Sequence, residues 1–139
     1  MTYPIATSLA LLLAAAIASA PANAAPVVVY AAGDIAECRG KPAGRSGAAL
    51  TAKLIQPGAT VLIPGDTAYP FATSETLQSC YEPTWGAFRA TTLVVPGNHD
   101  YVDGRSDDFR AYFGDGAAAN GYFARRIGDW LVICLDSEQ

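Results

Sequence analysis

A single pattern that occurs three times along the chain constrains the fold more than any other feature. Each time, a short apolar run leads into a glycine followed by an oxygen-bearing side chain: Gly33-Asp34, Gly65-Asp66 and Gly97-Asn98. The three polar residues are spaced 32 positions apart in both intervals, about the length of a strand–helix–strand repeat. The pattern predicts parallel strands that carry polar side chains at their carboxyl ends.

Four apolar runs are the candidate strands, at 27–30, 61–63, 92–95 and 131–134. None alternates apolar with polar residues, which is typical of strands buried on both faces of a sheet. Helices are expected at 46–55, with Ser46 as a candidate N-cap, at 84–90 and at 107–113. The order of strand, helix and strand predicts an α/β fold with mostly parallel strands and a right-handed crossover.

The carboxyl-terminal part of the chain is expected to add an antiparallel hairpin to this sheet. Residues 122–127 and 130–135 flank Gly128-Asp129, and glycine followed by aspartate suits a two-residue hairpin turn.

Residues 1–24 are predicted to be a cleaved signal peptide that is not part of the fold. The first 23 residues hold no charged side chain, and Ala22-Asn23-Ala24 has the small-x-small pattern of a cleavage site. The alternative is a transmembrane anchor, for which the apolar run is short. Cleavage leaves residues 25–139 as a secreted or periplasmic domain that makes no membrane contact.

Export places the three cysteines in an environment where a disulfide can persist. Cys38 and Cys80 lie in loops that contain glycine or proline, whereas Cys134 lies in the last apolar run. We predict a Cys38–Cys80 disulfide and a free thiol at Cys134. The alternative, three unpaired cysteines, remains open at this point.

The charge balance argues against nucleic acid as a partner. The 139 residues carry a formal net charge of −4, and Arg125-Arg126 is the only adjacent basic pair. A nucleic-acid-binding surface has a basic stripe or patch instead. A nucleotide-binding α/β module is disfavoured too, because the chain has no glycine-rich phosphate loop.

The three polar strand ends predict a metal site. Open α/β sheets bind ligands at the carboxyl ends of their strands, so Asp34, Asp66 and Asn98 are expected to converge. Two carboxylates brought together repel each other unless a cation intervenes, and Lys and Arg are sparse nearby. Hard cations take carboxylate and amide oxygens. Each dipeptide alone is more often a simple turn, but three in register favour the metal site.

Three neighbouring side chains are candidates for the same site. His99 is the only histidine in the chain, and it can offer a proton to a leaving oxygen. Asp100 can orient the ring of His99. Tyr69 would need a strongly acidic cation, such as ferric iron, to displace its proton. The alternatives are a surface or capping histidine and a tyrosine that is only packed.

These residues resemble the calcineurin-like metallophosphoesterases. The motifs that are similar to the first three of that family are Gly33-Asp34, Gly65-Asp66-Thr67-Ala68-Tyr69 and Gly97-Asn98-His99-Asp100. The spacing Asp66-x-x-Tyr69 resembles the purple acid phosphatases, in which that tyrosine binds ferric iron. Ala36 stands where other branches carry a histidine ligand. The resemblance implies that residues 25–139 form the amino-terminal half of an α/β/β/α sandwich.

The resemblance also implies a role for each residue. Asp34 and Tyr69 would bind the first metal ion, Asp66 would bridge both ions, and Asn98 would bind the second. His99 would act at the phosphate. The implied cofactors are Fe(III) and a divalent ion of iron, zinc or manganese. The implied reaction is hydrolysis of a phosphoester by a metal-bound hydroxide, on a phosphorylated small molecule or nucleotide.

The chain departs from the family after the third motif. The family supplies further histidine ligands downstream, whereas no histidine follows His99 here. We therefore expect a truncated sequence that binds the metal pair weakly and hydrolyses little. The alternative function is that of an exported, non-catalytic binding or interaction protein that keeps the scaffold without a complete metal site.

Overall fold

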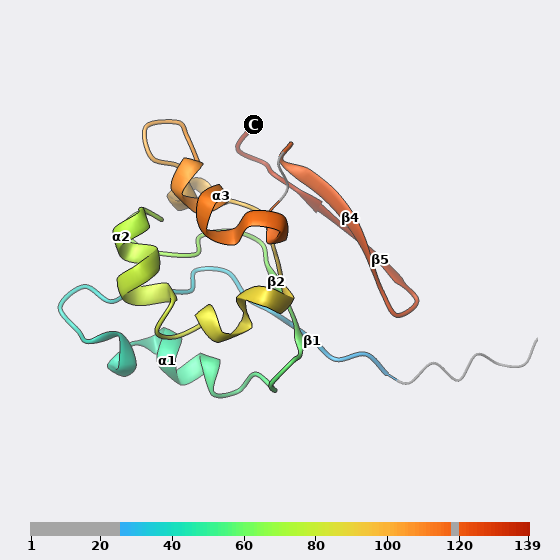
Figure 1. The fold of residues 1–139 in the computed structure, drawn as a ribbon, viewed down its shortest axis with the longest axis horizontal. Coiled ribbons are helices and arrows are strands. Elements are labelled where there is room, and N and C mark those ends of the chain that lie inside the picture. Colours follow the sequence, from blue (N-terminus) through green and yellow to red (C-terminus); the bar gives the residue numbers. More distant parts are fainter. Residues whose placement is uncertain (1–25, 118–119) are drawn as a thin grey trace, which may run out of the picture.

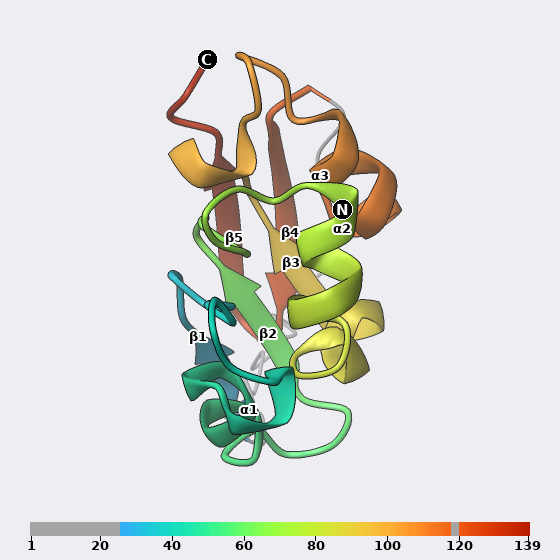
Figure 2. The ribbon, with the colours of Figure 1, turned by 90° about the vertical axis from the view of Figure 1, so that its left-hand side faces the viewer.

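The protein is an α/β structure in three layers, in a computed structural model that describes residues 26–117 and 120–139 (Figure 1). A parallel sheet lies in the middle, helices cover one of its faces, and a β-hairpin lies beside the other. Figure 2 shows the molecule from the helical side, with the strands behind the helices. The predicted signal peptide lies outside the described residues.

The central sheet has three parallel strands in the order β1-β2-β3. These are β1 (Val29–Ala31), β2 (Thr60–Ile63) and β3 (Thr92–Val94). In the middle strand Val61 and Ile63 are buried under the helices, whereas Leu62 is only partly buried. Leu62 lines a cavity of about 370 Å³ between the sheet and the hairpin. Strands β2 and β3 are therefore fully buried only on their helical face, and β1 has no fully buried residue.

Short helices form the covering layer. They are α1 (Gly47–Ala52), α2 (Ser74–Thr76) with a π-helical turn at Leu77–Tyr81, α3 (Asp107–Phe113), and 3-10 turns at Ala43–Arg45, Gly86–Thr91, Asn98–Asp100 and Gly114–Gly116. Ser46 caps α1 by accepting a hydrogen bond from the backbone N–H of Ala49 at 3.2 Å. The bounds predicted for α3 are confirmed, and α1 is shorter than predicted.

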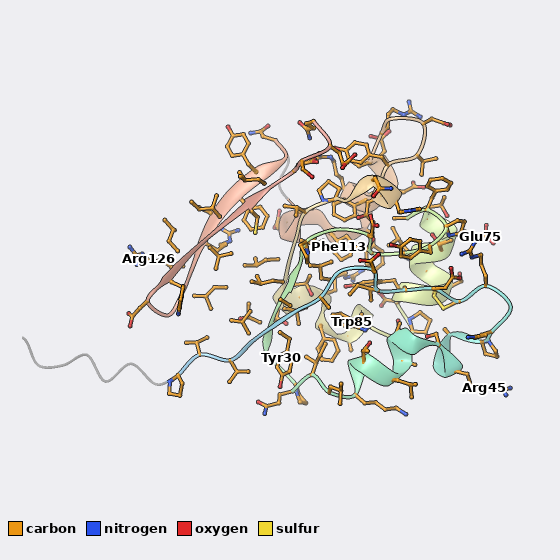
Figure 3. All side chains as sticks on the ribbon, turned by 180° about the vertical axis from the view of Figure 1, so that it is seen from behind. Tyr30, Arg45, Glu75, Trp85, Phe113 and Arg126 are labelled. Carbon is orange, nitrogen blue, oxygen red and sulfur yellow. A yellow bond between two sulfur atoms is a disulfide. The ribbon has the colours of Figure 1, made fainter. Side chains whose placement is uncertain are left out.

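The main core lies between the sheet and the helices. Tyr81 and Phe109 are its largest fully buried side chains. Trp85 crosses from the segment after α2 to α1, where its indole N–H donates to the backbone oxygen of Ala48 at 3.1 Å. Figure 3 shows Trp85 and Phe113 on the helical side of the sheet. A disulfide joins Cys38 to Cys80, with their Cα atoms 5.8 Å apart, and Cys134 is a free thiol.

The hairpin of β4 (Tyr122–Ile127) and β5 (Trp130–Leu135) has the predicted bounds and turn. Gly128 has a φ of 58°, which suits the first position of a type II′ turn. The expectation that this pair joins the central sheet is wrong, because β4 and β5 form a sheet of their own. At the edge of β3, Val94 is already bridged to Ala117. The hairpin lies instead over the face of the sheet.

Candidate metal centre

Asp34 and Asp66 emerge from the carboxyl ends of β1 and β2 with the same unusual backbone. Their φ angles are 54° and 57°, in the left-handed region that few residues other than glycine occupy. Aspartate is one of the residues that tolerate this conformation. The shared geometry turns the chain off both neighbouring strands in the same way.

Three side-chain oxygens meet at this edge of the sheet. The Tyr69 hydroxyl lies 2.8 Å from Oδ2 of Asp66, and it is also in close contact with Oδ1 of Asp34. A phenol has one proton and can donate to only one carboxylate at a time. Among the described residues, neither carboxylate forms an ion pair with Lys, Arg or His. The cluster therefore has more negative oxygens than protons or cations to balance them, which fits a bound cation.

The electrostatics of Tyr69 follow from its two carboxylate partners and its partial burial. Partial burial of the phenol, followed by its hydrogen bonds to Asp34 and Asp66, raises the pKa of Tyr69 well above the usual range. Without a cation the residue is a neutral phenol that donates a proton to a carboxylate. A strongly acidic metal ion reverses this preference, because it stabilises the phenolate.

The loop after β3 approaches the same cluster. The backbone N–H of His99 donates to Oδ1 of Asp66 at 3.0 Å, which brings residues 98 and 99 next to the carboxylate. The Asn98 side chain is exposed and makes no hydrogen bond within the described part of the chain. Its amide oxygen is thus available as a ligand, although no contact joins it to Asp34 or Asp66.

Asp100 is the buried link between the two loops. Its carboxylate accepts from the backbone N–H groups of Asp66 (2.7 Å), Thr67 (2.9 Å) and Gly97 (2.9 Å), and from the Thr67 hydroxyl. Burial raises the pKa of Asp100, and these hydrogen bonds oppose that shift. Asp100 contacts these groups and not the ring of His99, which the sequence predicts it to orient.

The ring of His99 has other partners. Its Nδ1 lies 2.7 Å from the backbone oxygen of Pro70, and its centroid lies 4.5 Å from that of the Tyr69 ring. The sequence gives no signal for Pro70, because a carbonyl oxygen is present at every residue. Thr67, whose hydroxyl donates to Asp100, is a further residue of the site that the sequence analysis does not single out. Its place between Asp66 and Tyr69 in the second motif is a signal that could have identified it.

Glycines allow the two loops to touch. A Cβ atom on Gly65 would lie 2.7 Å from Cα of Gly97, and one on Gly97 would collide with the Asp66 carboxylate. Gly65 and Gly97 are thus needed for this close approach, and Gly65 also has a positive φ of 117°.

The donor set consists of two carboxylates, a phenol and an amide. Across residues 26–117 and 120–139, no three or more His, Cys, Asp or Glu side chains are grouped so as to hold a metal ion. A metal here would therefore depend on oxygen from Tyr69 and Asn98 as much as on the aspartates. Such an all-oxygen set suits hard cations.

No family model, curated protein or solved structure matches this chain. In the described residues, no helix has the length and apolar character needed to cross a membrane.

Proposed function

We propose that this protein is a secreted, metal-dependent phosphoesterase of the purple-acid-phosphatase-like branch of the calcineurin-like metallophosphoesterases. The observation that carries the proposal is the meeting of the Asp34 and Asp66 carboxylates with the Tyr69 phenol, without a balancing cation among the described residues. The parallel order of β1, β2 and β3 supports the finer proposal that these residues form the amino-terminal half of an α/β/β/α sandwich.

The proposed ligands divide between two metal ions. Asp34 and Tyr69 would hold a ferric ion, because a phenolate needs a strongly acidic cation. Asp66 would contribute to the binding of both this ion and a divalent ion of iron, zinc or manganese, and Asn98 would help to hold the divalent ion. When bound, the metal pair would bind the phosphate oxygens and lower the pKa of the attacking water.

The chain's own residues supply positioning and a proton. Asp100 fixes the backbone on which Asp66 and Asn98 are carried, through its bonds to Asp66 N and Gly97 N. His99 is half-buried beside the cluster, so it can give a proton to the leaving oxygen of the ester. The substrate class is a phosphorylated small molecule or nucleotide.

Four protein ligands are fewer than two six-coordinate metal ions require. We propose that the remaining positions are filled by water and by substrate. The chain alone should then bind the metal pair weakly and hydrolyse an aryl phosphate slowly. Steady turnover by the purified chain, lost in Asp66→Asn, would show that the four ligands suffice.

Iron binding tests the proposal through the colour of tyrosinate on ferric iron. We expect the chain loaded with excess Fe(III) to develop a visible absorption band, because Tyr69 would become a ligand. Tyr69→Phe removes the oxygen and should abolish the band. Tyr122→Phe, which alters an exposed tyrosine of the hairpin, should retain it.

Two other outcomes count against this assignment. A colourless protein that carries iron, as measured by elemental analysis, would remove Tyr69 from the ligand set. A protein that takes up no iron, zinc or manganese at millimolar concentration would favour the exported, non-catalytic binding protein.

A further inference from the structure

A four-residue segment holds His99 from several directions. Tyr69 and Phe71 place their rings 4.5 and 5.8 Å from the imidazole, measured between centroids. Between them, the Pro70 carbonyl oxygen lies 2.7 Å from Nδ1. The next residue, Ala72, donates its backbone N–H to the backbone oxygen of His99 at 2.8 Å. Residues 69–72 therefore restrain both the backbone and the ring of His99.

The contact with Pro70 determines which ring nitrogen carries the proton. A backbone carbonyl oxygen only accepts hydrogen bonds, so Nδ1 must be the donor in this contact. In the neutral imidazole the other nitrogen, Nε2, then has a free lone pair. Nε2 has no hydrogen-bond partner in the described part of the chain, and the residue is half-buried. It is the nitrogen left to meet a ligand.

We propose that residues 70–72 are a positioning element that fixes the His99 ring with Nδ1–H on the Pro70 carbonyl oxygen and so leaves Nε2 as the nitrogen that meets the substrate. The catalytic part of this inference rests on the proposed function. The tautomer itself is a property of the chain and can be measured without metal or substrate.

Phe71 is the side chain that can be changed to probe this element. Phe71 is 46% exposed, so the core does not require it, yet its ring lies against the imidazole. The contact with the His99 ring explains why a phenylalanine is exposed at position 71. Pro70 is less useful as a probe, because every substitution keeps the carbonyl oxygen.

Nitrogen-15 NMR tests the tautomer directly. His99 is the only histidine, so a chain made without a histidine tag and labelled with ¹⁵N-histidine gives a single imidazole pattern. For the neutral imidazole we expect the shift of a protonated nitrogen at Nδ1 and of an unprotonated one at Nε2. Free histidine favours the opposite tautomer. A spectrum dominated by Nε2–H, or an even mixture, would overturn the proposal.

Three variants test whether Phe71 takes part. Phe71→Ala should shift the tautomer ratio toward Nε2–H, whereas Phe71→Tyr, which keeps the ring, should restore the wild-type pattern. Leu54→Ala, at another exposed apolar residue, should leave the pattern unchanged. An Nδ1–H pattern that is the same in Phe71→Ala would remove Phe71 from the element.

The outcome of the tautomer measurement is independent of the proposed function. Confirmation of the Nδ1–H tautomer in a chain that binds no metal would support the positioning element and refute the metal site. Iron-dependent colour together with an Nε2–H imidazole would support the metal site and refute the positioning element.

Discussion

At the scale of single residues, Asp100 organises the candidate site from behind. It is 1% exposed, and its carboxylate accepts bonds from both loops that carry proposed ligands. Three backbone N–H groups and one hydroxyl donate to the Asp100 carboxyl. An ionised carboxylate is the form that accepts these four hydrogen bonds best. The residue therefore stabilises the close contact of the loops from a buried position.

Replacing Asp100 by asparagine tests this role. We expect Asp100→Asn to lower the free energy of unfolding by about 2–4 kcal/mol, because the amide loses one acceptor and buries NH₂ donors against N–H groups. Urea unfolding measures the change. The control is Asp103→Asn, since Asp103 is exposed and asparagine suits its φ of 51°. Equal stability of both variants would show that the buried bonds contribute little.

Gly97 offers a second test at this scale. A Cβ at this position would lie 2.8 Å from the backbone nitrogen of Asp66, so Gly97→Ala must displace the loop that carries Asp66. We expect a loss of about 1–3 kcal/mol in urea unfolding. Gly44→Ala places a Cβ in open space and should change stability by less than about 0.5 kcal/mol. A tolerated Gly97→Ala would contradict the observed closeness of the loops.

At the scale of elements, the parallel direction of the strands and the position of their ends could be predicted from the sequence. The spacing of Asp34 and Asp66 matched one strand–helix–strand unit, and parallel strands place both residues at one edge. The helix Asp107–Phe113 and the hairpin turn were predictable because local signals define them. The sequence analysis does not predict the helical segment over 73–81. Leu77, Cys80 and Tyr81 nevertheless have the spacing of one helical face, and Thr73 caps the helix by accepting from the backbone N–H of Thr76.

The disulfide joins two of these elements, the loop after β1 and the helical turn Leu77–Tyr81. It spans 42 residues, so its loss should destabilise the protein by about 4 kcal/mol through the entropy of the unfolded chain. The Cys38→Ser/Cys80→Ser variant should show this loss in urea unfolding, and Cys134→Ser should show far less.

A count of thiols checks the same bond. The unfolded protein should react with one equivalent of a thiol reagent before reduction and with three afterwards. Three reactive thiols before reduction would contradict the disulfide.

At the scale of the whole molecule, the layers were harder to predict than the elements. The sequence pattern places an antiparallel pair at 122–135, but it does not say whether that pair extends the sheet or lies over its face. The outcome depends on which edge of the central sheet is free. The edge at β3 is occupied, because Val94 is bridged to Ala117. The hairpin consequently exposes an apolar outer face, formed by Tyr122, Leu131, Ile133 and Leu135.

The candidate site shows the same division between local and global information. The meeting of the first two strand ends and the closeness of Tyr69 to Asp66 were predictable from spacing alone. The bonds of Asp100 to Asp66 and of His99 to Pro70 were not, because they join loops 29 to 34 residues apart whose paths no local signal sets. The position of the Asn98 side chain could not be predicted from the sequence either, because the geometry of its loop determines it.

A titration with Mn²⁺, followed by ¹H–¹⁵N NMR of the uniformly labelled chain, tests the central claim most directly. Paramagnetic broadening detects even a weakly bound cation and shows where it binds. We predict that the amide signals of Asp34, Asp66, Tyr69 and Asn98 broaden first, and that Asp66→Asn abolishes this selectivity. Broadening that begins instead at the exposed acidic residues Asp103, Asp107 and Asp108, or that is uniform along the chain, would contradict a cation site at the strand ends.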